Sequence, residues 1–167
     1  MELTDEIYDK IVALSEKGDE YADKEQFTSA LKQYDEALAL LPEPKTDWEA
    51  ATWLYVAMGD AYYNKQQLAQ AMNAYQKAMM SPEGTGNAYI WFCIGQIFYE
   101  EGNYEKAKTH FMSAYLLDGD EIFENENPAY FQLIKEETEK IEEKPQQEDQ
   151  QSEKKNPWKL PPDWNEN

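Results

Sequence analysis

Hydrophobic and polar residues alternate with the period of an α-helix in two neighbouring segments, residues 91–98 and 104–114. The polar run 100–103 separates these segments, so the pattern predicts two amphipathic helices joined by a tight turn. Each predicted helix carries one small residue, Gly95 or Ala107, between large apolar side chains. We expect the two helices to cross closely at these small residues.

The same pattern occurs in two further places along the chain. In every copy, a glycine on the first predicted helix is followed twelve residues later by an alanine on the second. Large apolar or aromatic side chains lie three or four positions from both small residues. A single match would be weak, but three in one register indicate an internal repeat. The three pairs are Gly18 and Ala30, Gly59 and Ala71, and Gly95 and Ala107.

The repeated pattern resembles the signature of the tetratricopeptide repeat, in which Trp-x-x-Leu-Gly-x-x-Tyr precedes Ala-x-x-x-Phe and a closing Pro. The third copy reads Trp91-x-x-Ile94-Gly95-x-x-Phe98 and then Ala107-x-x-x-Phe111. The resemblance implies an all-α fold, with three helix-turn-helix repeats in a right-handed solenoid and a C-terminal capping helix. The repeats are expected at about residues 11–44, 52–85 and 88–121.

The capping helix is expected at about residues 128–143. Asn127 is placed to cap this helix, whose first residue is a proline. Tyr130, Ile134 and Ile141 form one apolar stripe, and charged residues fill the rest of the segment. A helix with one apolar and one polar face is typical of the end of a repeat array.

The array is expected to occupy residues 1–144 and a flexible tail residues 145–167. The tail begins as a Gln-, Glu- and Lys-rich linker and ends in a segment with two tryptophans and three prolines. Permanent exposure of large apolar rings is unfavourable, so we expect Trp158, Leu160 and Trp164 to dock on a folded surface. Fold-back onto the array is the preferred version, and a free motif recognised by another protein is the alternative.

Charge narrows the possible partners. The 167 residues include 34 acidic side chains and 15 lysines but no arginine, and the net charge is −19 at pH 7. Phosphate backbones are bound by basic side chains, so nucleic acid is not an expected partner. A basic protein is favoured, although the acidity could serve solubility alone.

Features that would predict a membrane or secreted protein are missing from the sequence. The N-terminus lacks the basic and apolar regions of a signal peptide, and no apolar run approaches the ~18 residues of a membrane-spanning helix. The single cysteine, Cys93, excludes an internal disulfide and fits a reducing compartment. We expect a cytoplasmic protein without a membrane anchor.

Few residues in the sequence are candidates for catalysis or for binding a metal or cofactor. His110 and Cys93 lie on different predicted helices, and a Cys–His pair also needs direct contact and a third, orienting group. Neither a zinc-ligand spacing nor a glycine-rich phosphate loop occurs. The segment 118–121 begins like a calcium loop, but Ile122 and Phe123 follow where such a loop needs polar residues and glycine. The sequence therefore predicts a non-enzyme without cofactor or metal site.

In the tetratricopeptide family the first helix of each repeat lines a concave face, which implies where a partner would bind. Two of the implied positions are equivalent carboxylates, Asp19 and Asp60. Most of the others are aromatic, and rings flanked by carboxylates suit a partner with apolar anchors and lysine or arginine. Alternatively, some of these rings only pack against adjacent helices. The remaining candidates are Trp53, Val56, Tyr63, Tyr89, Phe92, Gln96 and Tyr99.

Family members that hold the acidic C-terminus of heat-shock chaperones use Lys, Arg and Asn on this face. That function is not expected here, because acidic or neutral residues stand at those positions. In length, acidity and repeat number the chain is similar to the small chaperones of type III secretion translocators. The positions that hold the heat-shock chaperone C-terminus in those family members correspond here to Ser15, Asp19, Ala57, Tyr89 and Cys93.

Together these features predict a non-enzymatic protein-binding module that sequesters or chaperones one specific, basic protein or peptide. A secretion chaperone or a toxin-neutralising immunity protein would act in this way. The alternative is a scaffold or assembly factor that uses the concave groove and the Trp-rich tail, and an enzyme is the disfavoured third hypothesis. The sequence leaves the oligomeric state open.

Overall fold

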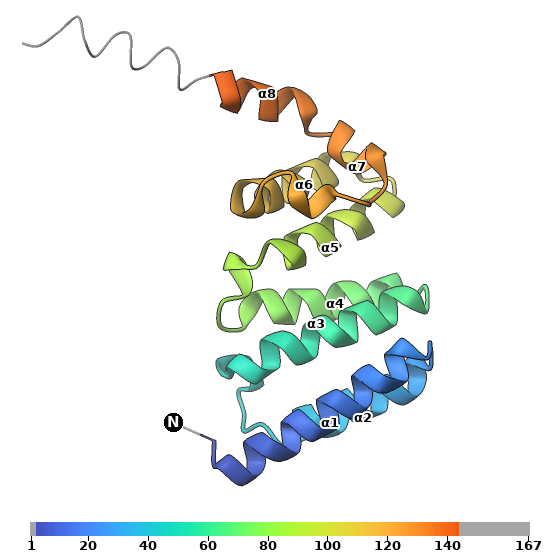
Figure 1. Cartoon of the computed structure of the whole chain (residues 1–167), viewed down its shortest axis with the longest axis vertical. Helices are drawn as coiled ribbons and strands as arrows, with labels where there is room; N and C mark the ends of the chain where they lie inside the picture. Colours follow the sequence, from blue (N-terminus) through green and yellow to red (C-terminus); the bar gives the residue numbers. More distant parts are fainter. Residues whose placement is uncertain (1–2, 144–167) are drawn as a thin grey trace, which may run out of the picture.

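The computed structural model describes residues 3–143, and this range contains α-helices and short 3₁₀-helices without a strand. Three antiparallel helix pairs are stacked along one axis (Figure 1), which confirms the predicted all-α solenoid. The pairs are α1 (Asp5–Asp23) with α2 (Phe27–Ala39), α3 (Glu49–Asn64) with α4 (Leu68–Met80), and α5 (Ala88–Glu100) with α6 (Tyr104–Asp118).

Short 3₁₀-helices lie in the connections that follow each pair. They are η1 (Lys45–Asp47), η2 (Gly84–Gly86) and η3 (Glu121–Phe123). Two further short helices, α7 (Pro128–Gln132) and α8 (Lys135–Glu143), complete the described chain.

The repeated glycines set the distance between the helices of each pair. A Cβ atom on Gly59 would lie 2.5 Å from the ring of Tyr75, and one on Gly95 would lie 2.7 Å from the ring of Phe111. Gly18 has the same relation to Tyr34. Only a residue without a side chain admits an aromatic ring at this distance, so the glycine pattern specifies the helix crossing.

The turn inside each pair has one residue with a positive φ angle. Glu25, Gln66 and Gly102 occupy equivalent positions, with φ values of 57°, 60° and 75°. Each donates its N–H three residues back, as Gln66 does to the Tyr63 carbonyl at 2.8 Å. The left-handed conformation favours glycine, and only the third repeat has glycine there.

Buried side chains form two clusters that follow the stack. The larger cluster joins the first two pairs to α5, and its largest fully buried members include Tyr34, Leu54 and Tyr75. The second cluster joins α5 and α6 to η3, α7 and the following turn, with Phe111 and Ile134 at its centre. The C-terminal segment therefore covers the end of the third repeat with apolar side chains.

The single capping helix predicted for residues 128–143 is in fact two helices. Leu133 and Ile134 donate to carbonyls three residues back, so a turn of 3₁₀ type interrupts the α-helical bonding between α7 and α8. The predicted apolar stripe also ends early, because Ile141 is 41% exposed. Polar contacts hold α8 to α6 instead: the Lys108 ammonium lies 2.6 Å from Glu137, and the Tyr115 hydroxyl donates to Glu142 at 3.1 Å.

Two further expectations concern the C-terminal tail and membrane-spanning helices. The tail residues Trp158, Leu160 and Trp164 lie outside the described residues. Within residues 3–143, none of the helices combines the length and the apolar character that crossing a bilayer requires.

Candidate protein-binding surface

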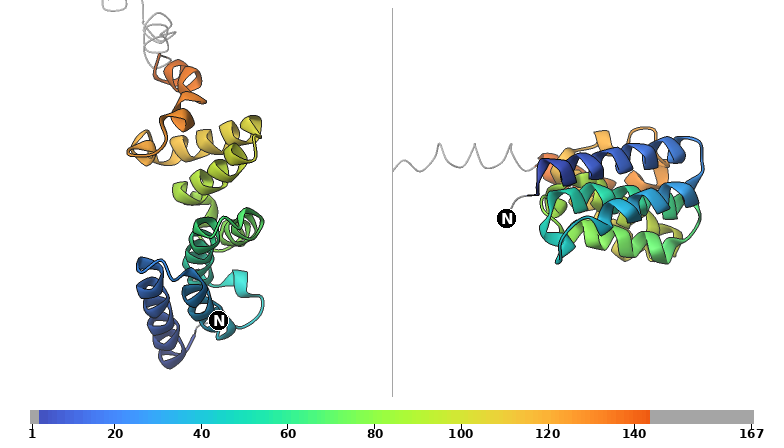
Figure 2. Two further views of the ribbon diagram at one scale, coloured as in Figure 1. Left: turned by 90° about the vertical axis from the view of Figure 1, so that its right-hand side faces the viewer. Right: turned by 90° about the horizontal axis from the view of Figure 1, so that it is seen from below.

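The first helices of the three pairs, α1, α3 and α5, share one side of the stack. Seen from the side, the stack is bowed, and its two ends project toward this side (Figure 2). The nine candidate binding residues lie on these helices. We call the surface that they form the inner face: Asp19 on α1; Trp53, Val56, Asp60 and Tyr63 on α3; and Tyr89, Phe92, Gln96 and Tyr99 on α5.

A tyrosine from the second helix orients the inner-face carboxylate in each of the first two repeats. The Tyr34 hydroxyl donates to Oδ1 of Asp19 at 2.7 Å, and the Tyr75 hydroxyl donates to Oδ1 of Asp60 at 2.6 Å. Fifteen residues separate donor and acceptor in both pairs. The ring that covers the repeat glycine thus also fixes the carboxylate next to that glycine.

Asp60 has a second donor from the neighbouring repeat. The Tyr89 hydroxyl donates to Oδ1 of Asp60 at 3.1 Å, which links α3 to α5 across the inner face. Burial raises the pKa of the Asp60 carboxyl, and the hydrogen bonds from Tyr75 and Tyr89 partly oppose this shift. Asp60 is therefore an enclosed carboxylate, whereas Asp19 is an exposed one.

Cys93 lies behind this group, and its side chain is buried. Burial raises the pKa of its thiol to about 12, and the Asp60 carboxylate adds to the shift. The thiolate is the reactive form, so a thiol with this pKa is inert at neutral pH.

The third repeat carries a different set of groups. Phe111 covers Gly95 and has no hydroxyl, and Gln96 stands at the position of Asp19 and Asp60. The Gln96 side chain instead meets Tyr130 of α7. Burial and the nearby Glu100 carboxylate raise the pKa of Tyr130, and the interaction with Gln96 opposes part of this increase. This end of the inner face is neutral at the repeat position and closed by α7.

Tyr63 and Tyr99 complete the part of the inner face near α7. The Tyr63 hydroxyl donates to Glu100. Burial is the main cause of the raised pKa of Tyr63, and the hydrogen bond to Glu100 adds to it. The ring of Tyr99 lies 5.0 Å from the rings of both Tyr104 and Tyr130. Both tyrosines are therefore partly committed to neighbouring helices, as the packing alternative anticipated.

Phe92 does not belong to the accessible surface. Its ring is 2% exposed and lies 5.4 Å from Phe123 and 5.9 Å from Tyr130. At the equivalent positions Val56 is partly exposed and Ser15 is buried, so burial beneath η3 and α7 is particular to Phe92. Phe92 is thus a core residue, and α7 takes the place that a further repeat would occupy.

The other candidates remain accessible to different degrees. Tyr89 is 44% exposed, and Asp19 is exposed. Partly exposed side chains make up the rest of the inner face: Trp53, Val56, Asp60, Tyr63, Gln96 and Tyr99.

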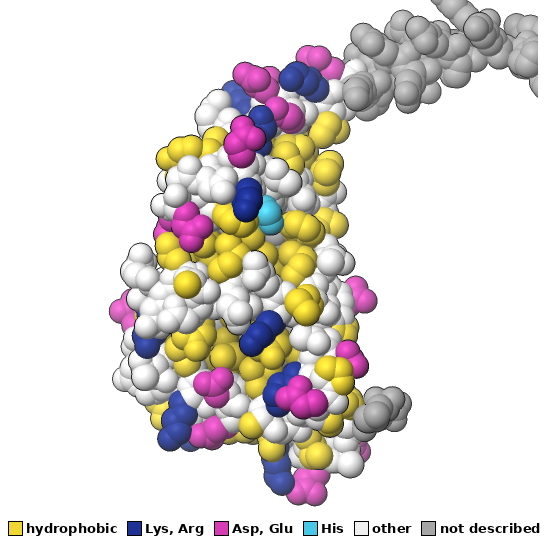
Figure 3. All heavy atoms as spheres, turned by 180° about the vertical axis from the view of Figure 1, so that it is seen from behind, with side chains coloured by type: hydrophobic (Ala, Val, Ile, Leu, Met, Phe, Trp, Pro, Cys, Tyr) yellow, Lys and Arg dark blue, Asp and Glu magenta, His cyan; other side chains and the backbone are white. Residues whose placement is uncertain are grey.

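The structure separates His110 from the inner face. Its ring lies on the opposite side of the stack (Figure 3), 5.5 Å from the ring of Trp91 and 5.0 Å from that of Phe98. The imidazole Nδ1 lies 2.8 Å from the carbonyl of Lys106. In the part of the chain that the structure describes, no three His, Cys, Asp or Glu side chains are placed to hold a metal ion.

Sequence reasoning missed the tyrosines that orient the carboxylates. The repeat pattern indicates only that large side chains, here Tyr34 and Tyr75, lie near the repeat alanines, and it assigns them no polar partner. The signal was present in the repeats themselves: a tyrosine follows the repeat alanine by four residues where an aspartate follows the glycine, and Phe111 stands there where Gln96 does. No comparable signal connects Tyr130 to Gln96, because α7 lies outside the repeat pattern.

Comparison with known proteins gives three findings. A family profile described as Tetratricopeptide repeat matches residues 54–82 and 88–121. The general transcriptional corepressor ssn6 of Schizosaccharomyces pombe is 28% identical over 107 residues, which are 64% of this chain and 9% of that protein. The chain thus spans about a tenth of that relative's length. The crystal structure of the Sgt2 TPR domain from Aspergillus fumigatus is similar in fold, with a TM-score of 0.57, 18% identity and 80% of each chain covered.

Proposed function

Because the chain belongs to the tetratricopeptide repeat family, whose repeats form protein-interaction surfaces, we propose that its inner face binds a basic segment of a partner protein. Binding of this kind sequesters or chaperones the partner, as a secretion chaperone or a toxin-neutralising immunity protein does. No role is taken from the corepressor, because this chain aligns with only 9% of that protein.

The observation that carries the proposal is the pair of oriented carboxylates. In Asp19 and Asp60 the bonded oxygen is Oδ1, and no other described residue donates to Oδ2 of either side chain. Each carboxylate therefore has one oxygen held by tyrosine and one oxygen left for an incoming donor. Lysine and arginine side chains supply donors that carry the complementary charge.

The surroundings of the two carboxylates favour the same partner chemistry. Asp23 and Glu100 lie at the ends of α1 and α5, close to the rim of the inner face, and the inner face as defined here contains no lysine. Trp53 and Tyr89 add partly exposed rings that can hold apolar stems or the face of a guanidinium group. Enclosure raises the pKa of Asp60, and a cation would offset the cost of keeping its charge there.

The test is a comparison of peptides by fluorescence anisotropy with the full chain. Lys- and Arg-rich peptides with aromatic anchors should bind, and the same peptides with Glu in place of Lys and Arg should not. Affinity should fall as salt rises, because surface attraction is screened over ~8–10 Å at physiological ionic strength. Equal binding of both peptide sets would contradict the proposal.

A charge-matched pair of variants separates the inner face from the general acidity of the chain. Asp19→Asn with Asp60→Asn removes two inner-face charges and should weaken binding at least about tenfold. Glu36→Gln with Glu105→Gln removes two exposed charges from the second helices α2 and α6 and should leave affinity within about twofold. Equal losses in the two double variants would assign the effect to net charge rather than to the inner face.

A further inference from the structure

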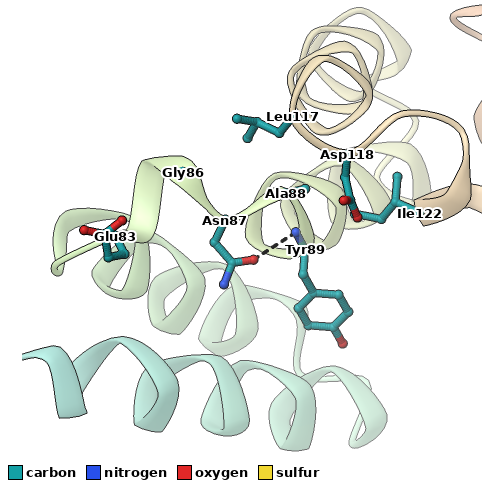
Figure 4. A pocket seen from close by; sticks show the side chains of 8 residues that line it. All are labelled: Glu83, Gly86, Asn87, Ala88, Tyr89, Leu117, Asp118 and Ile122. Atoms are coloured by element: carbon teal, nitrogen blue, oxygen red, sulfur yellow. Dashed lines mark hydrogen bonds between the residues drawn. The ribbon is translucent and has the colours of Figure 1, made fainter.

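A pocket of about 500 Å³ lies where η2, the start of α5 and the end of α6 meet (Figure 4). Ala88, Leu117 and Ile122 give it an apolar lining, and Glu83 and Asp118 contribute two carboxylates. This volume lies in the range of protein pockets that hold small ligands or single large side chains. The pocket is distinct from the inner face, although Tyr89 borders both.

Two neighbouring leucines at the end of α6 are exposed, and one of them lines the pocket. Leu117 is 48% exposed, and its neighbour Leu116 is 65% exposed. Leu117 lines the pocket and Leu116 does not. An exposed apolar side chain at a concave site gains from being covered, so the position of Leu117 points to an occupant with apolar groups.

The position of the chain end suggests which occupant this is. η2, the C-terminal end of α6 and the C-terminal end of α8 lie at the same edge of the stack in Figure 1. Another 24 residues follow Glu143, the last residue of α8. A flexible segment of the length between Glu143 and Trp158 has a typical reach of about 20 Å.

The composition of the chain end matches the lining of the pocket. Trp158 and Leu160 offer apolar groups, and Lys159 between them offers a cation for Glu83 and Asp118. Prolines at 157, 161 and 162 favour an extended segment that loses little conformational entropy on docking.

We propose that the segment 158–164 of the same chain occupies this pocket. The ring of Trp158 packs against Leu117 and Ile122, and the ammonium of Lys159 pairs with Glu83 or Asp118. The pocket thus functions as an internal docking site for the C-terminal segment, and this proposal stands independently of what the inner face binds.

Amide hydrogen exchange of the full chain at low protein concentration tests the proposal directly. Amides of residues 158–160 and 163–165 should exchange at least about tenfold more slowly than in an unstructured peptide of the same sequence. The protection should not depend on protein concentration. Exchange at the unstructured rate would overturn the proposal, and protection that grows with concentration would assign the pocket to a second copy instead.

Two neighbouring leucines provide a matched control. Leu117→Asp should abolish the tail protection, whereas Leu116→Asp adds the same charge one residue away and should preserve it. Equal protection in both variants would place the docking site elsewhere and overturn the proposal. Lys159→Glu tests the contact from the tail side without altering the helices, and it should reduce the protection even if Leu117→Asp fails to fold.

Discussion

The first two repeats and the third repeat make the same helix–helix contact with different side chains. In the first two, a tyrosine ring covers the repeat glycine, and its hydroxyl donates to the aspartate that follows this glycine, at 2.7 Å from Tyr34 and 2.6 Å from Tyr75. In the third, Phe111 covers Gly95, and Gln96 follows this glycine. The hydroxyl and the carboxylate are thus both present or both replaced.

This difference shows that the polar groups of the inner face depend on the second helix of each repeat. A carboxylate beside a buried ring is stabilised when the ring carries a donor, and it lacks that donor when the ring is phenylalanine. Gln96 has its neighbour on α7 instead, where it meets Tyr130. The first two repeats therefore present oriented charge, and the third presents a neutral surface beside the end of the array.

The largest expected effect comes from adding a methyl group to the repeat glycines. In Gly59→Ala the new Cβ would lie 2.5 Å from a ring whose hydroxyl is tied to Asp60, so the ring has little freedom to shift. We expect a loss of about 2–3 kcal/mol in the free energy of unfolding, from overpacking. Gly95→Ala should cost about 1 kcal/mol less, because the Phe111 ring has no such tether. Urea unfolding followed by circular dichroism measures both values.

A double variant identifies the cause of that difference. If the tether matters, the costs of Gly59→Ala and Tyr75→Phe should combine to less than their sum, because the untethered ring can move away from the new methyl group. Strict additivity would show that the hydroxyl does not hold the ring in place.

Removing the tyrosine hydroxyls should have the next largest effect. Tyr75→Phe withdraws a donor from an enclosed carboxylate and should cost about 1–2 kcal/mol. Tyr34→Phe should cost less than about 1 kcal/mol, because water can replace the hydroxyl at the exposed Asp19. Thermal and urea unfolding of both variants test the order, and an equal cost would mean that the two carboxylates have equivalent surroundings.

The repeats themselves were predictable from the sequence, because glycine and alanine at constant separation report directly on helix crossing. The same periodicity placed the side of α1, α3 and α5 on which the candidate residues lie. The repeat pattern did not reveal whether another segment covers a given position. Phe92 lies at a position that the pattern assigns to the concave face, but Phe123 and Tyr130 pack against its ring and bury it. That cover comes from a segment without repeat character, whose path the repeat pattern does not encode.

The break between α7 and α8 had no sequence signal either. Neither glycine nor proline occurs between Phe131 and Glu143, and the intrinsic pattern fits a continuous helix. Tertiary packing decides this case, since Tyr130 and Ile134 are buried in the core cluster at the end of α6, whereas α8 contacts α6 through charged and hydroxyl groups. Hydrogen-bond pairs between repeats, such as Tyr89 with Asp60, were likewise outside what periodicity can resolve.

The pH dependence of stability distinguishes the two carboxylates. Burial raises the folded-state pKa of Asp60 above its unfolded value, so its charge destabilises the fold at pH values above the folded pKa. This cost is relieved as the pH falls through the folded pKa, because the folded protein then takes up the proton. Asp60→Asn should therefore raise the melting temperature at pH 7, and the gain should shrink as the pH is lowered through that range. Asp19→Asn at the exposed position is the control, and a lower melting temperature for Asp60→Asn at pH 7 would mean that the tyrosine hydrogen bonds outweigh burial.

The smallest expected effect concerns the turns, where the third repeat has the glycine that the first two lack. Gln66 adopts a φ of 60° and Gly102 a φ of 75°, with equivalent N–H bonds to the Tyr63 and Tyr99 carbonyls at 2.8 and 3.0 Å. The left-handed conformation costs a residue with a side chain about 1–2 kcal/mol, whereas glycine loses more entropy on folding by about 0.5–1 kcal/mol. Gln66→Gly should therefore stabilise the protein by about 0.5–1 kcal/mol. Gly102→Ala should destabilise it by a similar amount, and this cost comes from the backbone conformation alone, because no atom lies within 4 Å of the new Cβ. Gln67→Gly, one residue further along at a φ of −96°, gains no such relief and should destabilise the protein. If Gln66→Gly and Gln67→Gly shift the melting temperature in the same direction, the left-handed turn is not the source of the difference between the repeats.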